Sequence, residues 1–197
     1  MELRLGDLLT LARETVLTPR TGVPRLLALN PPMEARWIGA GVVVCVSAVL
    51  AYLANILFPI RVETPWDWLT SSPLKMMLSQ SAGVLFTAGA MAFVGQRFGG
   101  RGSFPDALLL TVWMEFITLC VQVLQVVMML LFPLIAQLLG LVAFGLVFWM
   151  IVRFTAELHG FSNLVAVSVG VVITLFVGAL IAGIVMSTLG LVPVAGG

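Results

Sequence analysis

Five long apolar segments dominate this chain of 197 residues and decide what it can fold into. They are residues 37–58, 74–95, 107–131, 134–152 and 161–186, with Pro133 separating the third from the fourth. Twenty-two residues of α-helix span about 33 Å, enough for a hydrocarbon core of about 30 Å. No segment alternates apolar and polar residues as a barrel strand does. Since only helices and closed barrels satisfy the backbone in lipid, the sequence predicts an all-α polytopic membrane protein with five transmembrane helices.

The composition excludes several other classes of protein. The chain is 60% hydrophobic and 10% charged, whereas a soluble domain is about 25% charged. A net charge of +1 provides no positive field for nucleic acid. One histidine and two cysteines are too few for a zinc cluster or a disulfide framework, and both Cys45 and Cys120 lie inside apolar segments. We therefore expect no cofactor, no metal site and no enzymatic activity.

The basic residues predict the orientation of the helices. If the N-terminus is cytoplasmic, eight of the ten basic residues also lie on the cytoplasmic side, which satisfies the positive-inside rule. These eight are Arg4, Arg13, Arg20, Arg25, Arg36, Arg97, Arg101 and Arg153. The short tail 187–197 is then expected outside, and Trp66 and Trp68 are expected to anchor the preceding outer loop at the interface.

Residues 1–36 are expected to form a cytoplasmic segment that contains a short amphipathic helix. Its apolar side chains recur at helical spacing and include Leu5, Leu8, Ala12 and Val16. Two interpretations are open. The helix could lie on the cytoplasmic leaflet or dock a partner, or it could pack against its own helical bundle.

The third apolar segment contains a stripe of polar residues along one helix face. Thr111, Glu115, Thr118, Gln122 and Gln125 are spaced by four, three, four and three residues. A carboxylate facing lipid would cost at least ~2.5–3.5 kcal/mol, so this face must look at the bundle interior, a partner or water. The four uncharged side chains are typical of hydrogen bonding between helices. Glu115 has no cation at its depth, so we expect it to be protonated, and it is the candidate for a functional site.

Small residues on other segments predict close helix packing. Gly170, Thr174, Gly178 and Ala182 recur every four residues in the fifth segment, and Gly83 lies on a similar face of the second. Such faces let backbones approach closely, either within the chain or between protein molecules. Between the second and third segments, residues 99–103 are glycine-rich but lack a phosphate-loop ending, so we expect a flexible turn. His159 is interpreted as the end of a helix.

Two local sequences and the overall layout resemble the Yip family, the Ypt/Rab-interacting-protein membrane proteins, in its bacterial branch. Leu17-Thr18-Pro19-Arg20 follows the amphipathic helix, and Phe98-Gly99-Gly100-Arg101-Gly102-Ser103-Phe104 joins the second and third segments. The resemblance implies an integral membrane protein without catalytic residues. Eukaryotic members bind prenylated Rab GTPases, but their Asp-Leu-Tyr-Gly-Pro motif is absent from this sequence. The resemblance therefore does not carry Rab binding over to this chain.

Two functional hypotheses follow. The first is a non-enzymatic interaction protein of the bacterial cytoplasmic membrane: an accessory subunit, assembly factor or membrane-organising scaffold that acts by intramembrane helix packing. Its partners would be membrane lipids and other integral membrane proteins, or a second copy of itself. The second is a small transporter or channel that uses Glu115 as a proton or cation site.

Overall fold

The computed structural model describes residues 5–58 and 70–188, and every regular element in these ranges is a helix. The helices are α1 (Leu5–Leu17), α2 (Pro19–Ala28), α3 (Met33–Leu57), α5 (Pro73–Arg97), α6 (Phe104–Leu131), α7 (Pro133–His159) and α8 (Leu164–Thr188). The last five are long and apolar enough to cross a membrane. The prediction of an all-α protein with five membrane spans is confirmed.

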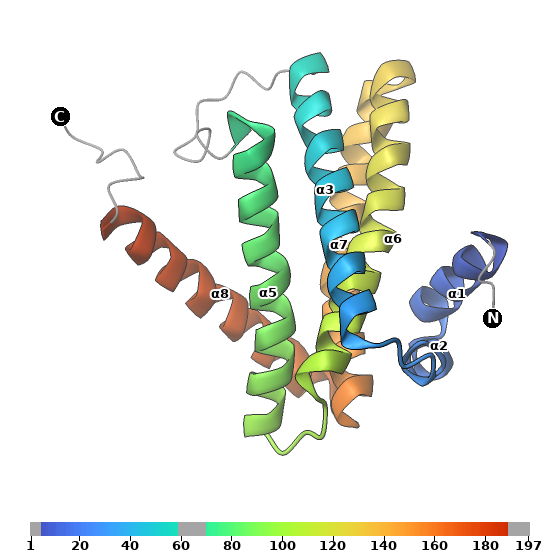
Figure 1. Cartoon of the computed structure of the whole chain (residues 1–197), viewed down its shortest axis with the longest axis vertical. Helices are drawn as coiled ribbons and strands as arrows, with labels where there is room; N and C mark the ends of the chain where they lie inside the picture. The colour runs from blue at the N-terminus through green and yellow to red at the C-terminus, as the bar shows by residue number, and fades with distance from the viewer. Residues whose placement is uncertain (1–4, 59–69, 189–197) are drawn as a thin grey trace.

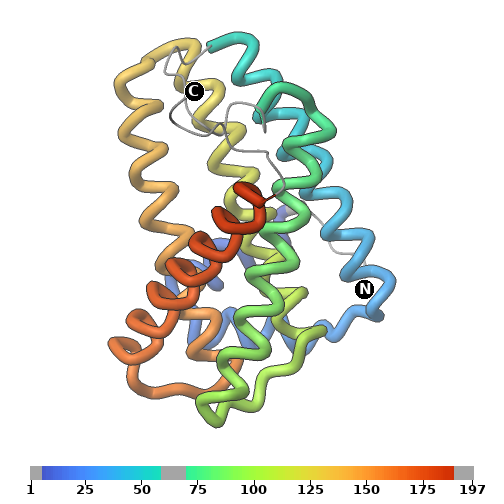
Figure 2. The backbone as a smooth tube through the Cα atoms, turned by 90° about the vertical axis from the view of Figure 1, so that its left-hand side faces the viewer, coloured from blue at the N-terminus to red at the C-terminus, as the bar shows by residue number. Residues whose placement is uncertain are grey.

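Four of the spans form an upright bundle, and the fifth runs at an angle to it. Helices α3, α5, α6 and α7 lie side by side in Figures 1 and 2, and α6 contacts each of the other three. Helix α8 leaves the end of α7 and runs obliquely across the bundle toward α5 in Figure 2. No residue of α8 is buried. The last span is therefore attached to the bundle much more loosely than the other four.

The observed helices extend beyond several predicted segments because hydropathy marks the hydrocarbon core and not the helix ends. Helix α6 begins at Phe104, three residues before the predicted segment, since the Ser103 side chain accepts the Asp106 N–H as an N-cap. Helix α7 continues past Val152 to His159, and Gly160 ends it in the left-handed conformation with φ 73°. Helix α8 begins at Leu164, later than predicted.

The longest helices exceed the thickness of a hydrocarbon core, so they tilt in the bilayer or extend beyond its core. The 28 residues of α6 span about 42 Å, which exceeds the hydrocarbon core by roughly 12 Å. One end of the bundle carries four arginines, and we call it the basic end. They are Arg36 near the start of α3, Arg97 and Arg101 between α5 and α6, and Arg153 in the last turns of α7. The assignment of this end to the cytoplasm remains a prediction from the positive-inside rule.

The N-terminal helices α1 and α2 form a hairpin against the side of the bundle (Figure 1). Leu11, Val23 and Leu26 are buried in the main apolar core with residues of α5, α6 and α7. The Trp113 Nε1–H of α6 donates to the Thr15 hydroxyl of α1 at 2.9 Å in a buried contact. Of the two interpretations that the sequence left open, the structure shows the amphipathic helix packed on its own bundle.

The main core lies in the half of the bundle near the basic end. Its members from the spans are Met91, Ala92, Ala107, Leu110, Trp113, Met114, Ile117, Met150, Phe154 and Leu158. The expected outer anchors Trp66 and Trp68 lie outside the described residues, as do residues 189–197 of the expected tail.

Candidate functional site

The polar stripe of α6 begins at Thr111, which faces α5. Its side chain is fully buried, and its hydroxyl donates to the Ala107 carbonyl at 2.9 Å. The same oxygen lies 3.8 Å from the Met91 sulfur of α5. Thr111 therefore satisfies its own hydroxyl within the helix and serves as packing surface toward α5.

The two glutamines of the stripe reach backbone carbonyls of neighbouring helices. Gln122 Nε2 donates to the Ser47 carbonyl of α3 at 3.5 Å, and Gln125 Nε2 donates to the Ala136 carbonyl of α7 at 3.4 Å. Gly140 of α7 makes room for Gln125, because a Cβ atom there would lie 2.8 Å from Nε2. These long contacts join α6 to two neighbours, as expected of polar residues that bind helices together.

Glu115 and Thr118 occupy the middle of the stripe and are half-buried. Within the described residues, the Glu115 carboxyl accepts no hydrogen bond and forms no ion pair. Its neighbours on the stripe, Thr111 and Gln122, point toward α5 and α3. Among the described residues, Glu115 and Thr118 are therefore the members of the stripe without a hydrogen-bond partner, and Glu115 is the ionisable one of the two.

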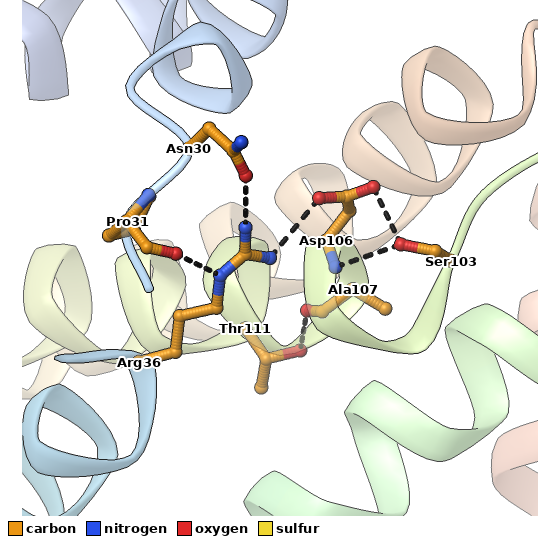
Figure 3. A network of polar contacts seen from close by, with 7 residues as sticks. All are labelled: Asn30, Pro31, Arg36, Ser103, Asp106, Ala107 and Thr111. Carbon is orange, nitrogen blue, oxygen red and sulfur yellow. Dashed lines mark hydrogen bonds and ion pairs between the residues drawn. The ribbon is translucent and has the colours of Figure 1, made fainter. Parts of the chain in front are cut away.

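A second polar cluster, which the sequence analysis missed, is centred on Arg36 at the start of α3 (Figure 3). The Arg36 side chain is only 4% exposed. Its Nε donates to the Pro31 carbonyl at 2.9 Å and its Nη2 to Asn30 Oδ1 at 2.9 Å. Its Nη1 pairs with Asp106 Oδ1 at 3.1 Å, and the Ser103 hydroxyl donates to the other carboxylate oxygen at 2.6 Å. The cluster joins the starts of α3 and α6 to the segment that follows α2.

A third cluster surrounds His159, the last residue of α7. The Gly102 N–H donates to His159 Nδ1 at 3.0 Å, so this nitrogen carries no proton. The proton is then on Nε2, which lies 2.7 Å from the Met91 carbonyl of α5 and donates to it. The expected helix end is present at His159, but the loop 99–103 is not a free turn, because the buried imidazole holds it against α5.

Glycines create the space for this imidazole. A Cβ atom would lie 2.1 Å from a ring nitrogen of His159 at both Gly95 and Gly100, and 2.8 Å from its Cε1 at Gly102. The Phe161 ring stacks on the imidazole at 5.3 Å between centroids. A signal was present in the sequence, since three glycines at an inter-helix turn can mark a close approach of backbone to a side chain.

The small residues of α5 and α8 differ in what surrounds them. Gly178 packs against Phe86 of α5, whose ring a Cβ atom would meet at 2.2 Å. Gly170 lines a cavity and has open space around it. Gly83 and Ala182 are exposed, and nothing lies within 4 Å of a Cβ atom built on Gly83.

The cavity lies between α5, α7 and α8 and has a volume of about 400 Å³. We call it the lateral cavity, because it is formed by three membrane spans and is partly open on one side. Its apolar lining includes Phe86 and Val94 of α5, Ile151 of α7 and Val167 and Leu175 of α8. Its polar lining consists of Thr87, Thr155, Ser162, Asn163 and Thr174.

The comparison with known families supports the resemblance drawn from the sequence. The family model described as Yip1 domain matches residues 15–188, which include all five candidate membrane spans. No curated protein and no solved structure matches the chain. The predicted resemblance to the Yip family is confirmed by the match.

Proposed function

Since this chain belongs to the Yip1 domain family of membrane proteins, we propose that it is a non-enzymatic interaction protein of a bacterial cytoplasmic membrane. It acts as an accessory subunit, assembly factor or membrane-organising scaffold. Its partners are other integral membrane proteins, which it contacts through helix packing inside the bilayer.

The observation that carries this proposal is the exposure of Gly83 and Ala182. The contact between Phe86 and Gly178 is where α5 and α8 meet. Gly83 precedes Phe86 by three residues and Ala182 follows Gly178 by four, so both lie beyond this contact on the side away from the basic end. Both small residues are exposed, and no other described part of the chain packs against the Cβ position of Gly83.

Small residues favour the association of helices within a membrane. Lipid tails are as apolar as leucine, so an exposed apolar face gives no driving force for association. Close approach of backbones at glycine and alanine does give one, through van der Waals packing. Exposed small residues on two neighbouring spans therefore indicate a docking place for a transmembrane helix of a partner.

The test is capture of the tagged full chain from its native membrane in mild detergent, with mass spectrometry of the proteins retained. Gly83→Leu should reduce the captured partner at least tenfold. The matched control is Gly145→Leu on α7, where the glycine is also exposed and also has no atom within 4 Å of its Cβ position. Wild-type protein that purifies alone, or equal capture by the Gly83 variant, would refute the proposal.

A second candidate function, transport through the bundle, has one observation in its favour. Glu115 is half-buried among the spans without a hydrogen-bond or ion-pair partner in the described part of the chain. An ionisable group at that depth is a default candidate for a proton or cation site. Purified protein in vesicles should then show a proton or cation flux that Glu115→Gln abolishes, whereas unchanged flux in the variant would exclude this function.

A further inference from the structure

The lateral cavity requires an occupant from the plane of the bilayer. Its volume of about 400 Å³ lies in the range of small-molecule sites, and most of its lining is apolar. The apolar part of the cavity does not hold water stably. Because α5, α7 and α8 all cross the membrane, the molecule that reaches its open side is a lipid or another membrane-embedded chain.

The length of the cavity matches one leaflet and not the whole membrane. Its lining on α5 runs from Phe86 to Phe98, which is about 18 Å of helix. One leaflet with its headgroups is about 20–22 Å thick, half of a full bilayer. At its inner limit, Phe86 packs on Gly178 and joins α5 to α8. A partner's transmembrane helix must cross both leaflets and does not fit this space, whereas a lipid of a single leaflet does.

The lining also changes from apolar to polar along its length. Thr155, Ser162 and Asn163 lie at the basic end, where α7 ends and α8 begins. Thr155 is only 7% exposed, and its hydroxyl oxygen has no hydrogen-bond partner among the described residues. An acceptor oxygen of a lipid at this level would satisfy that hydroxyl.

The charge around this mouth favours an anionic headgroup. The two segments next to it, residues 94–104 and 160–168, contain Arg97 and Arg101 and no acidic residue. Both arginines are exposed. The first turn of α8 adds the positive end of its helix dipole. The acidic residue on the adjacent turn of α7 is Glu157, two positions after Thr155 and therefore on the opposite side of that helix.

We propose that the lateral cavity holds one anionic phospholipid of the leaflet at the basic end. An acyl chain lies between α5 and α8 as far as the contact of Phe86 with Gly178, and the phosphate lies at the start of α8 near Ser162 and Asn163. The site does not depend on the proposed partner interaction, because Gly83 and Ala182 lie beyond that contact.

Native mass spectrometry of the full chain tests this site. The protein is delipidated in mild detergent and titrated with phosphatidylglycerol or with phosphatidylcholine of the same acyl chains. We expect one phosphatidylglycerol bound per protein, with at least tenfold preference over phosphatidylcholine. Gly170→Phe places a ring in the open space of the cavity and should weaken this binding at least tenfold.

The matched control is Gly183→Phe, also on α8 and also with open space at its Cβ position, but outside the cavity lining. Its binding should equal that of the wild type. If Gly170→Phe does not fold, Ala166→Phe on the same wall replaces it. Unchanged phosphatidylglycerol binding in the cavity-filling variant would overturn the proposal, and equal binding of phosphatidylcholine would overturn the assignment of an anionic headgroup.

Discussion

The packing of Gly95 against His159 gives the sharpest prediction for folding. A methyl group on Gly95 would lie 2.1 Å from Nε2 and 2.5 Å from Cδ2 of the imidazole, so Gly95→Ala must displace the ring. The displaced ring loses its bonds to the Met91 carbonyl and from the Gly102 N–H. A buried polar group left unsatisfied costs about 1–3 kcal/mol, so we expect Gly95→Ala to lower the free energy of unfolding by about 2–4 kcal/mol.

The effect of Gly95→Ala on the free energy of unfolding should change sign once the imidazole is removed. In a His159→Ala background no ring occupies the space next to Gly95. Replacing a helical glycine by alanine then stabilises the protein by about 0.5–1 kcal/mol. The difference between the two backgrounds is a coupling free energy of about 2.5–5 kcal/mol between positions 95 and 159.

The assay is equilibrium unfolding of the four proteins in mixed detergent micelles, followed by circular dichroism. Gly89→Ala is the control, because Gly89 lies on the same helix and a Cβ atom there would meet its nearest neighbour, Phe93, only at 4.0 Å. It should have the same small effect in both backgrounds. If the effect of Gly95→Ala differs by less than about 0.5 kcal/mol between the backgrounds, the inferred contact is refuted.

Three further substitutions test the other polar contacts by the same unfolding assay. Arg36→Met removes the hydrogen bonds of a buried guanidinium, one of them to the Asp106 carboxylate, which is 37% exposed, and should cost about 1.5–3 kcal/mol. Arg25→Met, at an exposed ion pair, should cost less than about 1 kcal/mol. Thr15→Val leaves the buried Trp113 N–H without an acceptor and should cost about 1–3 kcal/mol, with a parallel change in tryptophan fluorescence. Gln125→Leu removes a single long inter-helix contact and should cost only about 0.6 kcal/mol; a loss above 2 kcal/mol would contradict its assignment as a weak link between helices.

The features that the sequence predicts correctly are those that the bilayer itself imposes. The hydrocarbon core requires long apolar helices, and these are visible as uninterrupted segments. It also penalises polar side chains that face lipid, so the period of the stripe from Thr111 to Gln125 places that face of α6 toward other helices. The observed contacts of Thr111, Gln122 and Gln125 with α5, α3 and α7 agree with this argument.

The sequence was less informative outside the hydrocarbon core, where hydropathy no longer distinguishes the possible partners. Arg36 could be assigned to a helix flank from its position, but its ion pair with Asp106 connects residues 70 positions apart. Only the parallel alignment of α3 and α6 brings the two starts together. A charge at the start of each of two parallel spans was the available signal, and using it requires knowing that the spans are neighbours.

The His159 cluster and the lateral cavity share residues at the basic end. Met91 and Gly95 line the cavity and also lie against the imidazole. The Met91 carbonyl accepts its hydrogen bond, and Gly95 leaves room for the ring because it has no side chain. Phe161 stacks on the imidazole and also lines the cavity. Because the imidazole bonds to both α5 and the loop before α6, it fixes the end of α7 from which α8 departs. The loosely packed fifth span therefore starts beside an imidazole that is hydrogen-bonded to both α5 and the loop before α6 and stacked on Phe161.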